Sequence, residues 1–127
     1  MGGLLGTVGV EGESGSAVPA CHPGRHVVCI GRAEGGHRVH VVVGQTVTVV
    51  LGGSGLRWSG LRQVGPDLLR QRGTTVARGG TLRASYVAKG AGLTGLRASG
   101  APQCARGQAC PQFIVLWQVR VVIAARS

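Results

Sequence analysis

In the stretch from Gln112 to Ala124, a large apolar side chain occupies every second position from Phe113 to Ile123. Gln118 and Arg120 fall on one side of the alternation. The other side carries large apolar residues, namely Phe113, Val115, Trp117, Val119, Val121 and Ile123. A period of two is typical of a β-strand with one buried face. The stretch therefore predicts a long strand that needs a second apolar layer to cover it.

A second strand is expected from Thr46 to Leu51, where β-branched residues dominate and Val47, Val49 and Leu51 share one face. The glycine-rich stretch from Gly52 to Gly55 ends this strand, and Trp58 follows it. At that distance the tryptophan ring can return to the buried face, with its indole N–H seeking a partner at the edge.

Shorter strand-like segments occupy residues 26–30, 37–43, 68–69, 81–88 and 93–99, whereas residues 73–80 and 100–111 are expected to be loops. Glycine or proline separates the segments, and no stretch is convincingly helical. This pattern predicts an all-β fold, an antiparallel immunoglobulin-like β-sandwich of about seven strands. The 127 residues are enough for one domain, which we expect at residues 37–127, after a loose lead-in at residues 1–36.

The formal net charge is +10, with 14 Lys and Arg against 4 Asp and Glu. The arginines are scattered singly along the sequence rather than gathered in a run, which predicts a solvated basic surface. Aromatic residues, which stack on bases, make up only 3% of the chain. Nucleic acid is therefore not the partner that we expect.

The supply of acidic residues is too small for acid/base catalysis. Three of the four carboxylates, Glu11, Glu13 and Glu34, lie in the first third of the chain, and general acid/base chemistry needs two poised close together. The sequence predicts a protein that is not an enzyme and that has no cofactor. Gly90, Gly92 and Gly95 match G-x-G-x-x-G, but no long helix can follow before Gly100 and Pro102, so they are expected to be turn glycines.

The four cysteines form two close pairs in the sequence, Cys21 with Cys29 and Cys104 with Cys110. Their proximity predicts two local disulfides, with free buried thiols as the alternative. A second alternative is a zinc site, although neither pair has the two-to-four-residue gap of common structural sites. Its ligands would come from Cys21, His22, His26, Cys29, His37 and His40.

Disulfides predict export to an oxidising compartment, so we expect a secreted or cell-surface protein. Residues 1–20 lack the basic n-region of an intact signal peptide. The chain has no apolar run of about 18 residues, and no transmembrane segment is expected.

Five segments together resemble the chagasin-type inhibitors of papain-like cysteine proteases, a family of immunoglobulin-like sandwiches. The segments are Gly44–Leu51, Gly53–Trp58, Gly79–Tyr86, Lys89–Gly92 and Phe113–Ile123, within a span of about two thirds of the chain. In that family three loops at one end of the sandwich enter the protease cleft. The resemblance implies loops at Gly52–Arg57, Ala77–Gly80 and Gly100–Pro111. The candidate binding residues are Gly53, Ser54, Gly55, Leu56, Arg57, Arg78, Gly79, Gly80, Ala101, Pro102 and Gln103.

The loop sequences differ from the family pattern. The first lacks an Asn-Pro opening and a Thr-Thr-Gly core, the second keeps only Gly79-Gly80, and the third has Gly-Ala-Pro-Gln-Cys where an Arg-Pro-Trp type motif is expected. The primary prediction is therefore a non-catalytic, monomeric, extracellular or cell-surface immunoglobulin-like module with a protein partner. The alternative is an inhibitor of papain-like cysteine proteases that uses the three loops. An anion binder that uses the arginines is a third interpretation.

Overall fold

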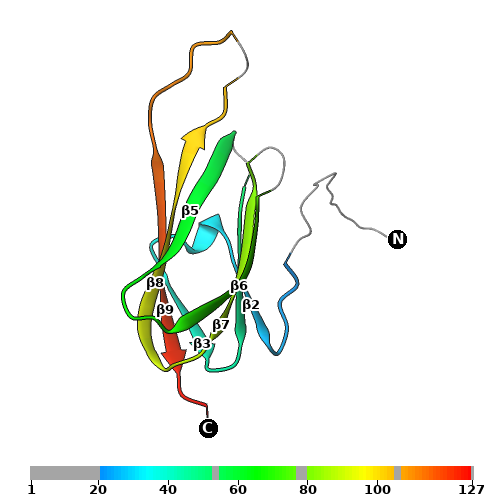
Figure 1. Cartoon of the computed structure of the whole chain (residues 1–127), viewed down its shortest axis with the longest axis vertical. Helices are drawn as coiled ribbons and strands as arrows, with labels where there is room; N and C mark the ends of the chain where they lie inside the picture. The colour runs from blue at the N-terminus through cyan, green and yellow to red at the C-terminus, as the bar shows by residue number, and fades with distance from the viewer. Residues whose placement is uncertain (1–20, 53–54, 77–79, 105–106, 127) are drawn as a thin grey trace, which may run out of the picture.

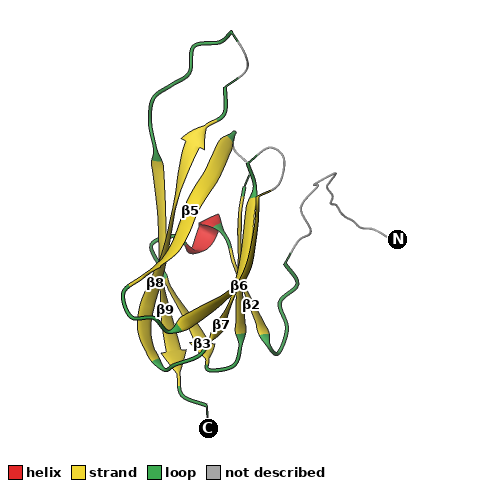
Figure 2. Cartoon of the chain, viewed as in Figure 1, coloured by secondary structure: helices red, strands yellow, loops and turns green. Residues whose placement is uncertain are grey.

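The computed structural model describes residues 21–52, 55–76, 80–104 and 107–126, and it is a sandwich of two four-stranded sheets (Figure 1). The first sheet has the order β2 (Val27–Ile30), β4 (Thr46–Leu51), β7 (Leu82–Ala88), β6 (Leu69–Val76). The second has the order β3 (Arg38–Val42), β9 (Val115–Ala124), β8 (Gly92–Pro102), β5 (Leu56–Val64). One turn of 3-10 helix, η2 (Arg32–Glu34), is drawn in red in Figure 2. The predicted β-sandwich is confirmed.

The core is built from the inward faces of the two sheets, as the alternation predicts. In β7 every second residue from Leu82 to Ala88 is buried, and β9 buries every second residue from Trp117 to Ile123. Val47, Val49 and Leu51 of β4 are fully buried, which confirms the second predicted strand. Removing this apolar surface from water is the main stabilising contribution to such a sandwich.

Trp58 of β5 lies at the centre of the core with no exposed surface, as expected. Its ring packs directly over Gly100 of β8, where an added Cβ would lie 3.1 Å from the ring. The guanidinium of Arg32 lies over the ring from outside, 5.4 Å from its centroid, a cation–π contact. Among the described residues the Trp58 indole Nε1 is buried without a hydrogen-bond partner, which differs from the expectation.

Two edge strands pair in parallel rather than antiparallel, β2 with β4 and β3 with β9. The chain passes from β2 in one sheet, through η2, to β3 in the other sheet. β2 and β3 thus lie at the edges of different sheets, and each runs in the same direction as its neighbour. Alternation shows which face of a strand is buried but carries no information on strand direction. β2 lies within residues 1–36, where a loose lead-in is expected. Residues 1–20 of that lead-in lie outside the described residues.

Several element boundaries differ from the prediction. β8 continues to Pro102, where a loop is expected from Gly100, and β9 begins at Val115 rather than at Gln112. β6 runs through Gly73 to Val76, where a polar connection is expected, and a register shift between Gln71 and Gly73 accommodates the glycine. β5 likewise continues through Gly60, which has a positive φ of 68°, next to a register shift. Both are β-bulges, which allow glycine inside a strand. Glycine therefore marks irregularities within these strands as well as their ends.

The end of the sandwich that carries the short turns from β5 to β6 and from β7 to β8 is closed by a polar network, and we call it the turn end. The Gln63 side-chain oxygen accepts hydrogen bonds from the backbone N–H groups of Leu68 and Leu69, at 2.8 and 2.9 Å. Asp67 forms an ion pair with Lys89 at 3.0 Å. The hydrogen bond and charge of Lys89, together with the Gln63 amide, lower the pKa of the exposed Asp67 carboxyl. The polar groups of the turn end thus find partners within the chain.

No helix in the described part of the chain is long and apolar enough to cross a bilayer.

Candidate protein-binding loops

Three connections lie together at the other end of the sandwich, which we call the loop end. They join β4 to β5, β6 to β7 and β8 to β9, and they lie toward the top of Figure 1. The connection between β8 and β9 is the longest of the three and extends beyond the ends of the strands. The sandwich therefore gathers the three segments that the resemblance implies as one surface.

Backbone hydrogen bonds tie the three loops to one another. The N–H of Gln103, in the third loop, donates to the carbonyl of Gly55, in the first loop, at 2.8 Å. The N–H of Trp58, just after the first loop, donates to the carbonyl of Gly80, in the second loop, at 3.0 Å. The first bond joins two exposed residues, and the second joins the buried Trp58 and Gly80. Together they hold the loop bases in one arrangement. The loop end has a fixed base rather than three independent connections.

Two glycines are required by the geometry of this base. Gly80 is buried, has a positive φ of 83°, and lies so close to the first loop that an added Cβ would be 2.6 Å from the Cα of Arg57. Gly55 has a positive φ of 67° and is exposed. Residues with a Cβ rarely adopt positive φ, and no side chain fits at Gly80. Both glycines shape the surface through their backbone.

The described candidate residues occupy different environments. Arg57, Ala101 and Gln103 are exposed at the loop end, and Pro102 is half-buried. The Leu56 side chain is buried in the core, so it supports the first loop from below and does not face a partner. Gly53, Ser54, Arg78 and Gly79 lie outside the described residues.

Both predicted disulfides are present. Cys104 and Cys110 close the third loop, with their Cα atoms 5.5 Å apart, and Cys21 is joined to Cys29, with their Cα atoms 5.9 Å apart. The zinc alternative is therefore wrong, because its two cysteines are bonded to each other and cannot act as thiolate ligands. Within the described ranges, no three His, Cys, Asp or Glu side chains are grouped so as to hold a metal ion.

The structure adds three exposed apolar residues, of which the sequence pattern assigns one, Phe113, to the buried face. The third loop, taken as the connection between β8 and β9, extends past Pro111 to the residue before Val115. Phe113 and Ile114 at its end are 50% and 68% exposed, and Leu116, at the start of β9, is 73% exposed. The last pair between β8 and β9 is Gly100 with Val115, so no strand lies opposite Phe113. The prediction of a buried Phe113 is wrong for this reason. Pro111, two residues before Phe113, is the sequence feature that could have indicated this exposure, because proline is rare inside a sheet and marks the nearby end of the loop.

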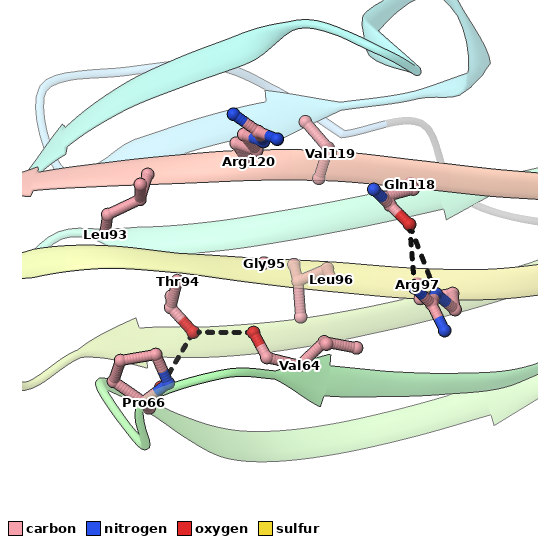
Figure 3. Close-up of a pocket in the computed structure, with 10 residues that line it drawn as sticks. All are labelled: Val64, Pro66, Leu93, Thr94, Gly95, Leu96, Arg97, Gln118, Val119 and Arg120. Carbon is pink, nitrogen blue, oxygen red and sulfur yellow. Dashed lines mark hydrogen bonds between the residues drawn. The ribbon is translucent and has the colours of Figure 1, made fainter.

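A shallow hollow of about 360 Å³ lies on the outer face of the second sheet rather than among the loops (Figure 3). It forms over Gly95, where β8 has no side chain, and Arg97, Gln118 and Arg120 surround it. The Arg97 guanidinium donates two hydrogen bonds to the Gln118 side-chain oxygen, at 3.0 and 3.2 Å. The glycines of G-x-G-x-x-G do not precede a phosphate-binding helix, because Gly92 begins β8 and Gly95 lies within it. The prediction of turn glycines is therefore wrong for Gly95, which pairs with Arg120 inside the sheet.

No protein-family model and no curated protein matches the sequence. Among solved structures, the chain is similar to EhICP2, a cysteine protease inhibitor from Entamoeba histolytica, with a TM-score of 0.56 and 13% identity. The match covers 77% of this chain and 95% of that one. The chain is also similar to amebosin, with a TM-score of 0.47 and 12% identity over 80% of this chain and all of that one. The likeness to EhICP2 shows that this chain has the sandwich fold of a solved cysteine protease inhibitor.

Proposed function

We propose that the chain is a non-catalytic inhibitor of papain-like cysteine proteases that binds the protease through the loop end. The observation that carries the proposal is the pair of backbone hydrogen bonds, from Gln103 to Gly55 and from Trp58 to Gly80, that hold three loops as one surface. The fold shared with a solved cysteine protease inhibitor favours this function over a general binding or structural module. Fold alone does not establish an activity, so the proposal rests on the loop end.

The arrangement suits insertion into a cleft. Loops that are already held in one conformation lose little entropy when they bind. The fully buried Trp58 supports the loop bases, and the Cys104–Cys110 disulfide restricts the third loop. A preorganised surface that fills the cleft excludes substrate without taking part in chemistry.

Phe113 and Ile114 supply the apolar contact in this proposal. Large apolar side chains at the centre of an interface carry most of its binding energy, and aromatic residues are enriched there. The third loop lacks the Arg-Pro-Trp type motif of the chagasin-type family. The exposed Phe113 ring lies in the same loop and would take over the aromatic contact. Arg57, exposed at the base of the first loop, would contact the rim of the cleft.

The proposed site of action is outside the cell or at its surface, and the inhibitor acts as a monomer. Disulfides persist in oxidising compartments, and both cysteine pairs form them. Papain-like proteases that act in such compartments are the partners that the proposal requires.

The test is steady-state inhibition of papain, with two pairs of matched variants. Phe113→Ala is expected to raise the inhibition constant by about 10- to 100-fold, because loss of a buried anchor typically costs that much affinity. Its control is Leu93→Ala, which removes an apolar side chain of similar exposure (45%) at the turn end. The control is expected to change the constant by less than about twofold.

The second pair compares exposed arginines. Arg57→Ala at the loop end is expected to weaken inhibition by about three- to tenfold, and Arg70→Ala at the turn end to leave it unchanged. Absence of papain inhibition by the unaltered protein at micromolar concentration would overturn the proposal. Equal effects of the loop-end and turn-end variants would show that inhibition does not occur through these loops.

A further inference from the structure

Four arginines that are far apart in the sequence form a row across the outer face of the second sheet. Arg62 of β5 is paired with Arg97 of β8, and Arg120 of β9 is paired with Arg38 of β3. Residues opposite each other in a sheet point to the same face, and this face is opposite to the buried Leu96, Val119 and Val121. Each of the four strands contributes one arginine, which gives a width of about 14 Å across the strands at the usual strand spacing. Arg97 is paired with Gln118 and Arg120 lies two residues along β9, so the row crosses the sheet obliquely. We call it the arginine row.

Carboxylates do not neutralise the arginine row within the described residues. Of the described acidic residues, Asp67 pairs with Lys89 at the turn end, and Glu34 accepts a hydrogen bond from the backbone N–H of Gly31 at 2.6 Å. Arg38, Arg62 and Arg120 are exposed, and Arg97 is held in place by Gln118. The prediction of arginines scattered over a solvated surface is therefore incomplete, because strand pairing gathers four of them on one face.

Shallow hollows lie between successive arginines along the row. One of about 270 Å³ has Arg62 and Arg97 on its rim, and one of about 360 Å³ over Gly95 has Arg97 and Arg120 (Figure 3). A third, of about 190 Å³, lies between Arg120 and Arg38. Gln118, an uncharged hydrogen-bonding residue, lines the second and third hollows. The row thus alternates guanidinium groups with spaces that can hold parts of a ligand.

We infer that the arginine row binds a sulfated polysaccharide laid across the strands. Guanidinium groups bind tetrahedral oxyanions through two parallel hydrogen bonds, and they keep their charge at any physiological pH. A chain with sulfate groups at intervals can place them on successive arginines while its sugar rings lie over the hollows. The face is separate from the loop surface, so this activity is additional to protease inhibition.

Charge alone would also suit nucleic acid, but two observations favour the polysaccharide. Binding of single strands uses several exposed aromatic side chains on which bases stack. The outward neighbours of the row on β8 and β9 are not aromatic, namely Leu93, Gly95, Ser99 and Leu116, and His40 of β3 supplies a single ring. Both disulfides indicate an oxidising compartment such as the cell exterior, and we take the polyanion to be one found there rather than an intracellular nucleic acid.

The test measures binding of the full chain to heparin as a function of salt. Arg62→Gln with Arg120→Gln removes two charges from the row, and Arg70→Gln with Arg72→Gln removes two exposed charges from β6 in the other sheet. The two variants have the same net charge. We expect the row variant to bind about 10- to 100-fold more weakly, with a salt slope shallower by about two, and the β6 variant to stay within about threefold. Unfolding midpoints of both variants control for folding.

A single Arg120→Lys change keeps the charge and removes the bidentate geometry. It is expected to weaken heparin binding by about three- to tenfold if the guanidinium contacts a sulfate directly. Desulfated heparin, a single-stranded DNA of equal charge and vesicles containing phosphatidylserine are the competing probes. The inference is overturned if the row and β6 variants lose affinity equally, if desulfated heparin binds as well as heparin, or if DNA or vesicles bind more tightly. Elution of the unaltered protein from heparin below about 150 mM NaCl would also overturn it.

Discussion

The two ends of the sandwich differ in how their polar and apolar groups are partnered. At the turn end, Gln63 makes hydrogen bonds with Asp67, Leu68 and Leu69, and Lys89 neutralises Asp67. At the loop end, backbone hydrogen bonds join the loop bases, whereas the third loop leaves Phe113 and Ile114 exposed. Both ends expose some apolar surface, Leu93 (45%) and Val64 (38%) at the turn end and Phe113 (50%) and Ile114 (68%) at the loop end. The turn end satisfies its polar groups within the chain, whereas the loop end holds its larger exposed apolar side chains beside a fixed base of backbone hydrogen bonds.

This difference indicates that the loop end, rather than the turn end, is the surface that binds a partner. Exposed apolar groups on a preorganised surface mark an interaction site, while a closed polar network stabilises the fold itself. Substitutions at the turn end should therefore change stability without changing inhibition. Substitutions at the loop end should change inhibition by more than their effect on stability explains.

The largest effect is expected from Trp58→Ala, which removes the buried ring beneath the loop end. The substitution removes the buried ring and leaves a cavity over Gly100. Together these should lower the free energy of unfolding by about 3–5 kcal/mol, measured by urea denaturation. Trp58→Phe, which keeps an aromatic ring, is the control and should cost less. A loss below about 1 kcal/mol for the alanine variant would show that the ring does not support the loop bases.

The next effect separates the two disulfides. Replacing Cys104 and Cys110 by Ser removes a crosslink with a sequence separation of 6. The free energy of unfolding should fall by about 2 kcal/mol, because the unfolded chain without the crosslink has more conformational entropy. Replacing Cys21 and Cys29, with a separation of 8, should cost a similar amount. Only the first variant should weaken papain inhibition. Equal inhibition by both variants would break the link between the third loop and binding.

Gln63→Ala should destabilise the turn end by about 1–2 kcal/mol, because the backbone N–H groups of Leu68 and Leu69 lose their acceptor. Gln118→Ala is the matched control, since the exposed Gln118 side chain accepts its hydrogen bonds from the Arg97 side chain rather than from backbone N–H groups. It should cost less than half as much. Thermal unfolding gives the stability change, and papain inhibition should be unaltered by either variant.

The smallest expected effect is the loss of the Asp67 ion pair at acidic pH. Lys89 and Gln63 lower the pKa of the Asp67 carboxyl below its usual 3.8, so its stabilising contribution is present above that value. The contribution is lost as the pH falls through the lower pKa of the folded state. Asp67→Asn should flatten the dependence of the unfolding midpoint on pH below about pH 4, by a small amount because the pair is exposed. An unchanged dependence would show that the ion pair does not contribute.

Much of the fold follows from local patterns in the sequence. The alternation in β4 and β9 specifies their buried faces, and the short cysteine separations specify both disulfides. The loop positions follow from the resemblance, but Leu56 shows its limit, because a residue beside a turn can belong to the core. Local sequence therefore predicts elements better than it predicts exposure at their ends.

What the sequence does not reveal depends on pairing between distant strands. Phe113 continues the alternation of β9, yet it is exposed because β8 has no residue opposite it. Arg62 and Arg97 are neighbours only because β5 and β8 pair in that register. A register is set by the whole sheet and by its bulges, which a pattern within one strand cannot report.

The most direct test of the central claim is binding to papain with its cleft free and with its cleft blocked. A surface that enters the cleft requires that the cleft be empty, whereas a surface that binds elsewhere does not. Biolayer interferometry with immobilised papain, before and after alkylation of its catalytic cysteine by a bulky irreversible inhibitor, measures both. We predict binding to free papain and a loss of at least about 100-fold in affinity after blocking. Equal binding to both forms, or binding to neither, would contradict the account.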